Sequence, residues 1–306
     1  MRRLEDHMRH LSFGFLMISA LSVNSDALCA QTSWTAVERT IGRSGVPQAG
    51  DVLRFNFPRS DLRVVLDGVQ LRPNLVLRSW VSFKRMPDGQ SMIMGDLVLA
   101  EDEINPVISA LQQGGVEQTA LHNHLVGARP GTMNLHIAGH GPEQTLATTI
   151  RRAMEITKTP LDTAGAGGSA PFEVDTVALA RALGYSGRVA GGVYQVGVPR
   201  LERVSESGQE IPGVMGLATV INFQSTGGGK AAIAGDFVMT EAEVNPVIRA
   251  LRGSDIGITA LHSHMLGESP RLYFMHFWAN DDALKLARGL RNALAQTNSV
   301  KPSGAP

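Results

Sequence analysis

Cysteine is nearly absent from this chain, since Cys29 is the sole one among 306 residues. Without a second cysteine no intramolecular disulfide can form, and only Cys29 is left as a candidate thiol nucleophile. An excess of charge of one sign is absent as well, because 28 basic residues balance 28 acidic ones. Proteins that bind nucleic acid usually carry a basic patch or stripe. We therefore expect no nucleic acid partner.

Long apolar runs are also missing, and the one notable stretch runs from Leu11 to Val23. Basic residues precede this stretch and small residues follow it, which is the order of a secretory signal peptide. The stretch is too short for a stable membrane span. The sequence thus predicts a signal peptide over residues 1–30, cleaved after Ala27 or Ala30, and a soluble periplasmic or secreted protein with no membrane span.

The chain contains the same segment twice. Residues 95–111 return as residues 235–251 with 11 of 17 positions identical, and Thr119-Ala120-Leu121-His122 returns as Thr259-Ala260-Leu261-His262, both at an offset of 140 residues. Such self-similarity at one offset indicates a tandem duplication. We expect copy one over residues 31–160, a linker rich in Gly, Ala and Ser over 161–172, copy two over 173–297, and a flexible tail over 298–306.

Each copy has alternating strand and helix patterns. In copy one, strand patterns cover 53–57, 62–66, 77–84, 91–99, 119–125 and 132–137, and helix patterns cover about 105–111 and 143–156. Apolar residues at period two favour strands, and those at helical spacing favour helices. In copy two, Asn245-Pro246 and the pair Thr240 and Glu243 offer two competing helix starts. The pattern predicts an α+β fold in which each copy is a mostly antiparallel sheet with two packed helices, a β-rich part followed by β-α-β-β-α.

Histidine is concentrated in two matching windows. Seven of the nine histidines lie beyond the signal segment, and all seven fall in these windows: His122, His124, His136 and His140 in copy one, and His262, His264 and His276 in copy two. Residues i and i+2 of a strand project to the same face. An antiparallel hairpin would then bring the third histidine alongside the first two. The sequence predicts a trio of imidazoles on one sheet face in each copy.

Three imidazoles form a ligand set that zinc, copper, nickel or iron accepts, with a coordination position left open for water or substrate. We therefore expect a divalent transition metal, with manganese as a further candidate, in a metal-binding protein or a metal-dependent enzyme. The alternative is a non-catalytic envelope module that binds a small-molecule ligand or a partner through its hairpin loops. Its histidines would be structural, held by Asn123, Asn134 or backbone groups.

Copy two adds Glu268, and the spacing His262-x-His264-x3-Glu268 is similar to the first metal motif of cupins. The flanking helix patterns argue against a cupin barrel, so only the chemistry is carried over, by analogy. Copy one has Ala128 in place of Glu268, and its His140 corresponds to Asn280 of copy two. Because a carboxylate adds a negative ligand, we expect the site in copy two to bind metal more tightly.

Two other motifs receive structural interpretations. Gly95-Asp96 and Gly235-Asp236 occupy the same strand position in both copies, so we interpret the aspartates as turn or bulge contacts rather than as paired catalytic carboxylates. The glycine-rich segment 226–230 aligns with a predicted hairpin turn of copy one. No helix with phosphate-loop spacing follows it, so a turn is expected there as well.

The duplicated strings resemble a known family. Gly235 to Ile248, Thr259 to Arg271 and Phe274 to Ala279 are similar to a duplicated bacterial family of unknown function, of DUF1259 type, that includes the mycobacterial LppY and LpqO lipoproteins. The resemblance spans nearly the whole predicted mature chain. It implies an exported envelope protein, and it transfers no activity. Unlike the lipoprotein members, this chain has no good lipobox before Cys29.

Overall fold

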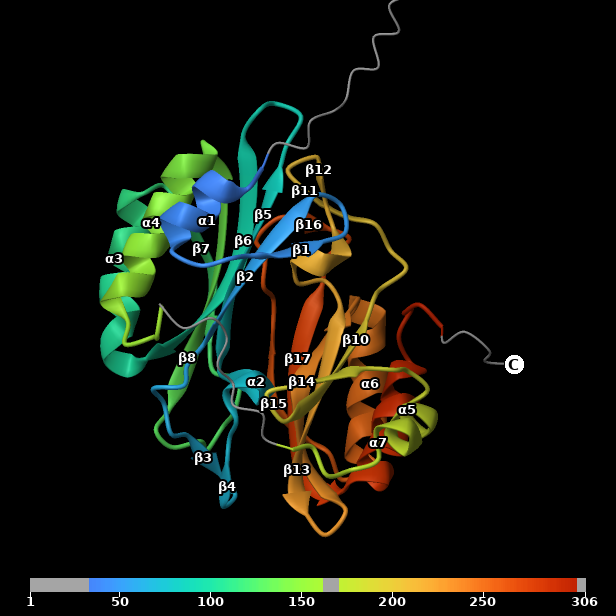
Figure 1. Ribbon diagram of the computed structural model, residues 1–306. Coiled ribbons are helices and arrows are strands. Elements are labelled where there is room, and N and C mark those ends of the chain that lie inside the picture. The colour runs from blue at the N-terminus through green and yellow to red at the C-terminus, as the bar shows by residue number, and fades with distance from the viewer. Residues whose placement is uncertain (1–32, 162–170, 302–306) are drawn as a thin grey trace, which may run out of the picture. The chain divides into compact units, whose positions relative to one another are not determined.

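The computed structural model describes residues 33–161 and 171–301. The predicted signal peptide, most of the predicted linker and most of the predicted tail lie outside the described residues. Within the described part, no helix is long and apolar enough to cross a membrane. The repeated segments form two similar sheets, each with its own set of helices (Figure 1).

Copy one forms a six-stranded antiparallel sheet in the order β1-β2-β5-β6-β8-β7. The strands are β1 (Val46–Gln48), β2 (Val52–Pro58), β5 (Arg78–Arg85), β6 (Ser91–Ala100), β7 (Glu117–His122) and β8 (Thr132–Gly141). Helices α1 (Thr35–Ile41), α3 (Ile104–Gln113) and α4 (Glu143–Ile156) pack on it. The connection between β2 and β5 holds β3 (Val65–Leu66), β4 (Val69–Gln70) and α2 (Pro73–Val76).

Copy two repeats this arrangement in the order β15-β17-β14-β13-β10-β9. Its strands are β9 (Arg188–Ala190), β10 (Val193–Val198), β13 (Thr219–Gly227), β14 (Lys230–Met239), β15 (Gly257–His262) and β17 (Tyr273–Asp282). Its helices are α5 (Thr176–Leu183), α6 (Glu241–Arg252) and α7 (Ala283–Leu294). A small separate sheet joins β11 (Val204–Glu206), β12 (Gln209–Ile211) and β16 (Glu268–Ser269).

This architecture confirms the predicted α+β duplication. Copy one has two more helices than predicted, α1 and α2, and copy two has one more, α5. These short helices bury at most two side chains each, so their apolar patterns are faint in the sequence. The predicted strand over 62–66 is reduced to the two residues of β3. Helix α6 begins at the earlier of its two candidate starts, because Glu243 accepts the backbone N–H of Thr240 at 2.7 Å.

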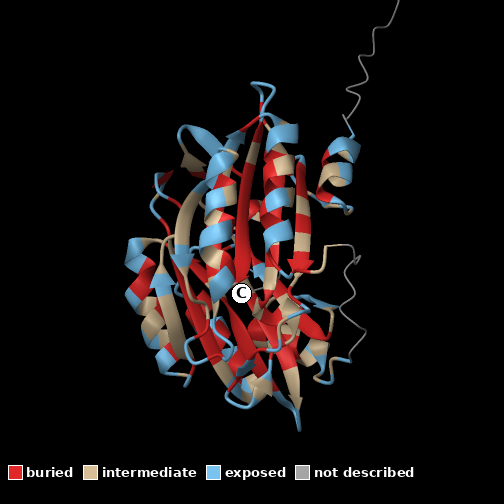
Figure 2. Ribbon diagram, turned by 90° about the vertical axis from the view of Figure 1, so that its left-hand side faces the viewer, coloured by how far each residue is buried: buried red, intermediate tan, exposed pale blue. Residues whose placement is uncertain are grey.

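Alternation along the strands gives each sheet two different faces. One face packs under the helices of the same copy, and Leu135 and Ile137 of β8 belong to that core. The strands beneath the helices are mostly buried, whereas the outward helix faces are exposed (Figure 2). The other face meets residues of the other copy, as where Leu75 shares a core with Trp278 and Met94 shares one with Phe274.

A buried arginine anchors the end of the same strand in both copies. Arg59 donates to the carbonyl oxygen of Val98 at 2.7 Å and to Glu103 at 2.7 Å. Arg200 donates to the carbonyl oxygen of Val238 at 2.6 Å and forms an ion pair of 2.8 Å with Glu243. The contacts of Arg59 tie the end of β2 to β6 and to the helix that follows β6. The contacts of Arg200 tie the end of β10 to β14 and to α6 in the same way.

Candidate metal centre

The predicted hairpins place three histidines of each copy on the sheet face that meets the other copy. His136 lies in β8 opposite Asp96 of β6 and Ala120 of β7, and His276 lies in β17 opposite Asp236 and Ala260. Since Leu135 and Ile137 point into the core beneath the helices, His136 points the other way. His122 and His262 end their strands.

The two trios form one cluster instead of two separate ones. The ring centroids of His122 and His262 are 3.5 Å apart, those of His124 and His276 are 3.7 Å apart, and those of His136 and His264 are 3.6 Å apart. Each of these three pairs joins one copy to the other. The expectation of two independent sites is therefore corrected, because the histidine-bearing faces of the two sheets face each other.

Two carboxylates complete the cluster, and neither was selected from the sequence. Asp96 Oδ2 lies 3.8 Å from His124 Nε2 and 3.9 Å from His136 Nε2. Asp236 Oδ2 lies 3.8 Å from His264 Nε2, and its Oδ1 lies 3.9 Å from His276 Nδ1. The strand pairing is regular at Asp96, so the interpretation as a bulge contact is wrong. The available signal in the sequence was the Gly-Asp pair itself, which is repeated at the same offset of 140 residues as the histidines.

The glycine of that pair has a separate steric role. A Cβ atom at Gly95 would lie 2.7 Å from the carbonyl oxygen of Trp80, and one at Gly235 would collide with the carbonyl oxygen of Val220. Neighbouring strands approach too closely here for a side chain. Glycine thus lets the sheets carry an aspartate into the cluster at the next position.

Many polar atoms of the cluster have no hydrogen-bond partner within the described residues. Buried atoms without a hydrogen bond include both ring nitrogens of His122 and the Nε2 atoms of His124, His136 and His276. His276 Nδ1 lies 3.0 Å from the carbonyl oxygen of Gly235, and that oxygen can only accept a hydrogen bond. The proton is therefore on Nδ1, and the Nε2 lone pair is free to bind a metal ion.

Burial lowers the pKa of all six histidines, to about 4 for His262 and about 3 for His276. Burial also raises the pKa of Asp96 to about 7, and it raises the pKa of Asp236 well above its ordinary value together with the nearby Asp96. The imidazoles are thus neutral at pH 7, which is the form that binds metal. A cation in the cluster would favour the ionised carboxylates.

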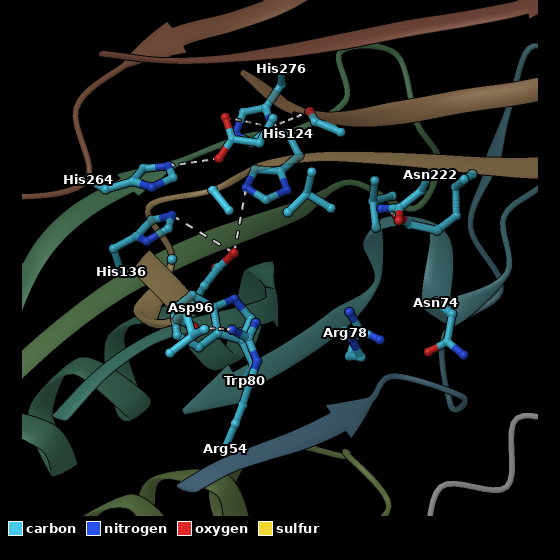
Figure 3. Close-up of a pocket in the computed structure, with 18 of the residues that line it drawn as sticks. Arg54, Asn74, Arg78, Trp80, Asp96, His124, His136, Asn222, His264 and His276 are labelled. Carbon is cyan, nitrogen blue, oxygen red and sulfur yellow. Dashed lines mark hydrogen bonds and ion pairs between the residues drawn. The ribbon is translucent and has the colours of Figure 1, made fainter. Parts of the chain in front are cut away.

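A cavity of about 180 Å³ adjoins the cluster and is lined by Asp96, Asp236 and four of the histidines. Figure 3 shows the side chains of Arg54, Arg78 and Trp80 below the histidines. The guanidinium carbon of Arg54 lies 3.9 Å from the Trp80 ring centroid. A small molecule in this cavity would therefore contact both the candidate ligands and two cationic side chains.

Two predicted ligands lie apart from the cluster. Glu268 is buried, but it accepts the backbone N–H of Leu272 at 3.0 Å and pairs with Arg271 at 3.2 Å. His140 pairs with Asp88 at 3.0 Å, and both side chains are nearly half exposed. Neither residue belongs to the groups of potential ligand atoms that lie within 4.8 Å of one another. Asn134, expected as a partner of a histidine, donates instead to Asp96.

The chain belongs to the family described as Domain of Unknown Function (DUF1259), whose model matches residues 35–156 and 177–296. This confirms the duplicated family of unknown function that the sequence resembles. No curated protein matches the chain. A solved structure similar to it is a trimeric bacterial microcompartment shell protein, PduB, with 13% identity over 86% of this chain and 100% of that chain and a TM-score of 0.23. A likeness at this score supports no conclusion about fold or function.

Proposed function

We propose that the protein binds two divalent transition metal ions in one dinuclear centre between the two copies. The six histidines divide into two equivalent sets of three, each with two members from one copy and one from the other. Ligand atoms of His122, His124 and His276 lie within 4.8 Å of one another, and so do those of His136, His262, His264 and again His122. We assign His122 to the first set, which leaves His136, His262 and His264 as the second. The offset of 140 residues relates each member of one set to a member of the other.

Each carboxylate lies between these two sets. Asp96 approaches His124 of the first set and His136 of the second, and Asp236 approaches His276 and His264 in the same way. A carboxylate has two oxygens and can bind two cations at once. In this proposal Asp96 and Asp236 would bridge two ions, each of which would have three imidazole ligands.

The observation that carries this proposal is the set of buried imidazole nitrogens that face one another without partners. An unpartnered buried polar group costs about 1–3 kcal/mol, so the five histidines that carry such nitrogens favour a bound ligand: His122, His124, His136, His262 and His276. The Nε2 atoms of His262 and His264 are 3.1 Å apart. Two nitrogens bound at 2.0–2.1 Å to one tetrahedral ion are about 3.3 Å apart, so this pair needs little adjustment.

Imidazole-rich sites suit zinc, copper, iron and nickel better than manganese. The adjoining cavity gives a small molecule access to the centre, as a metal-dependent enzyme requires. We therefore favour an enzyme, either a hydrolase or an oxidoreductase, over an envelope module with structural histidines. Export stays a prediction, because the predicted signal peptide lies outside the described residues.

Elemental analysis of the purified, dialysed protein tests this proposal. We expect two transition metal ions per chain, and loss of both when His124 and His264 are replaced together by alanine. Exposed His140 is the control, since His140→Ala should keep both ions. Protein with no bound metal after dialysis and after reloading with zinc, copper, nickel, iron or manganese would favour the structural role of the histidines.

A further inference from the structure

The two walls of the cavity differ although the metal ligands are repeated. The buried pair Arg59 and Arg200 aligns Arg54 with Gln195, five residues earlier in each copy. Ser79 and Thr219 each accept the N–H of an equivalent valine, which aligns Arg78 with Ala218 and Trp80 with Val220. Copy one thus contributes two cations and an aromatic ring where copy two has neutral or small side chains.

Arg54 and Arg78 use few of their N–H donors in hydrogen bonds within the described residues. Arg54 donates to the carbonyl oxygen of Val214 at 3.2 Å, and Arg78 makes a long contact of 3.5 Å with Gln195 Oε1. Within the described residues, neither guanidinium group forms an ion pair with a carboxylate. Each guanidinium group has five N–H donors, and a buried charge is costly unless it is paired.

The charges around the cavity also favour a negatively charged ligand. Burial, together with neighbouring arginines, lowers the pKa of Arg54 to about 9 and that of Arg78 to about 10. Two divalent ions would bring four positive charges against the two negative charges of Asp96 and Asp236. With both ions bound, the cavity would therefore have an excess of positive charge that an anionic ligand would neutralise.

We infer that Arg54 and Arg78 bind the oxyanion of a small carboxylate or phosphate compound and hold it against the metal centre. The planar guanidinium group matches both oxyanions with paired hydrogen bonds. A cavity of about 180 Å³ suits a small molecule, since benzene fills one of about 150 Å³. The inference rests on the proposed metal centre, which would contact the other end of the ligand.

Titration calorimetry tests this with inorganic phosphate and with succinate, and neutral succinamide serves as the ligand control. Arg54→Gln and Arg78→Ala introduce the residues that copy two has at these positions. We expect each variant to bind the preferred anion at least about tenfold more weakly, because one hydrogen bond to a charged group contributes that much. Exposed Arg63 provides the matched control, and Arg63→Gln should bind like the original protein.

Elemental analysis of every variant separates the two proposals. Unchanged anion affinity in Arg54→Gln and Arg78→Ala with full metal content would overturn the arginine site, as would failure of the original protein to bind either anion. Arginine-dependent anion binding in a protein without metal would overturn the metal centre alone. If Arg54→Gln does not fold, Arg54→Lys keeps the charge without the planar group, and we expect it to weaken binding as well.

Discussion

The two copies share the residues that would hold metal and differ in those that would hold a ligand. His122, His124, His136 and Asp96 each have an identical residue 140 positions later. Arg54 and Arg78 do not, since Gln195 and Ala218 take their places. The comparison shows that the candidate metal ligands are repeated, whereas the cationic wall that we propose binds an anion occurs in copy one alone.

The largest effect is expected from removing the histidines of one copy. The double variant His124→Ala with His136→Ala should lose both ions, and so should His264→Ala with His276→Ala, because each double variant removes one ligand from each of the two three-histidine sets. Metal stoichiometry of the two purified variants measures this. Two independent sites would instead leave one ion in each variant, and that outcome would restore the simpler interpretation of one site per copy.

The buried ion pairs should matter equally in both copies. We expect Arg59→Met and Arg200→Met each to lower the free energy of unfolding by about 3–5 kcal/mol, because each leaves a buried glutamate without its partner. Urea denaturation gives the difference. Lys158, an exposed residue whose ion pair with Asp102 spans 3.9 Å, provides the control, and Lys158→Met should change stability little. A loss below 1 kcal/mol in either copy would show that its anchor is dispensable.

Replacing the glycine of the Gly-Asp pair should lower the free energy of unfolding by different amounts in the two copies. Both Gly95→Ala and Gly235→Ala would push a Cβ atom against a neighbouring backbone carbonyl, and the approach is closer in copy two. We expect a loss of about 1–3 kcal/mol in unfolding free energy, with the larger loss for Gly235→Ala. The exposed loop residue Gly131, which has open space around it, is the control. Equal stability of all three alanine variants would contradict the close approach of the strands.

The stability of the metal-free protein should fall in acid. Burial depresses the pKa of His262 to about 4 and of His276 to about 3, whereas an unfolded histidine titrates at about 6.5. Between these values the unfolded chain binds more protons, so unfolding becomes easier as pH falls from about 6.5 towards 4. The raised pKa of Asp96 acts in the opposite direction, but six histidines outnumber two aspartates.

Urea midpoints of metal-free protein between pH 7.5 and pH 5 measure this dependence. We expect the midpoint to decrease with decreasing pH, and to decrease less in His276→Asn, which removes one titrating group. A midpoint that stays constant or rises towards pH 5 would mean that the histidines are not buried in their neutral form.

The smallest effect is expected at Glu268. Since its carboxylate already accepts the N–H of Leu272 and pairs with Arg271, Glu268→Gln should leave the metal content of the protein unchanged. Elemental analysis beside Asp236→Asn, which should reduce metal content, provides the contrast. Loss of metal in Glu268→Gln would restore the asymmetry between copies that the sequence suggested.

Local patterns in the sequence predicted the duplication, the sheets and the histidine trios, because strand alternation and hairpins are determined by residues near one another. Glu268 was misleading because its spacing is correct, while the small sheet formed by β11 and β16 holds it elsewhere. Asp96, Arg54 and the meeting of the two trios depend on contacts between distant segments. Periodicity does not encode such contacts.

Anomalous diffraction from crystals of the metal-loaded protein tests the central claim most directly. The account predicts two peaks between β8 and β17, about 3.5–4 Å apart as in other two-metal sites, each within bonding distance of histidines from both copies. Two distant peaks, each surrounded by the histidines of a single copy, or no peak among the histidines, would contradict it.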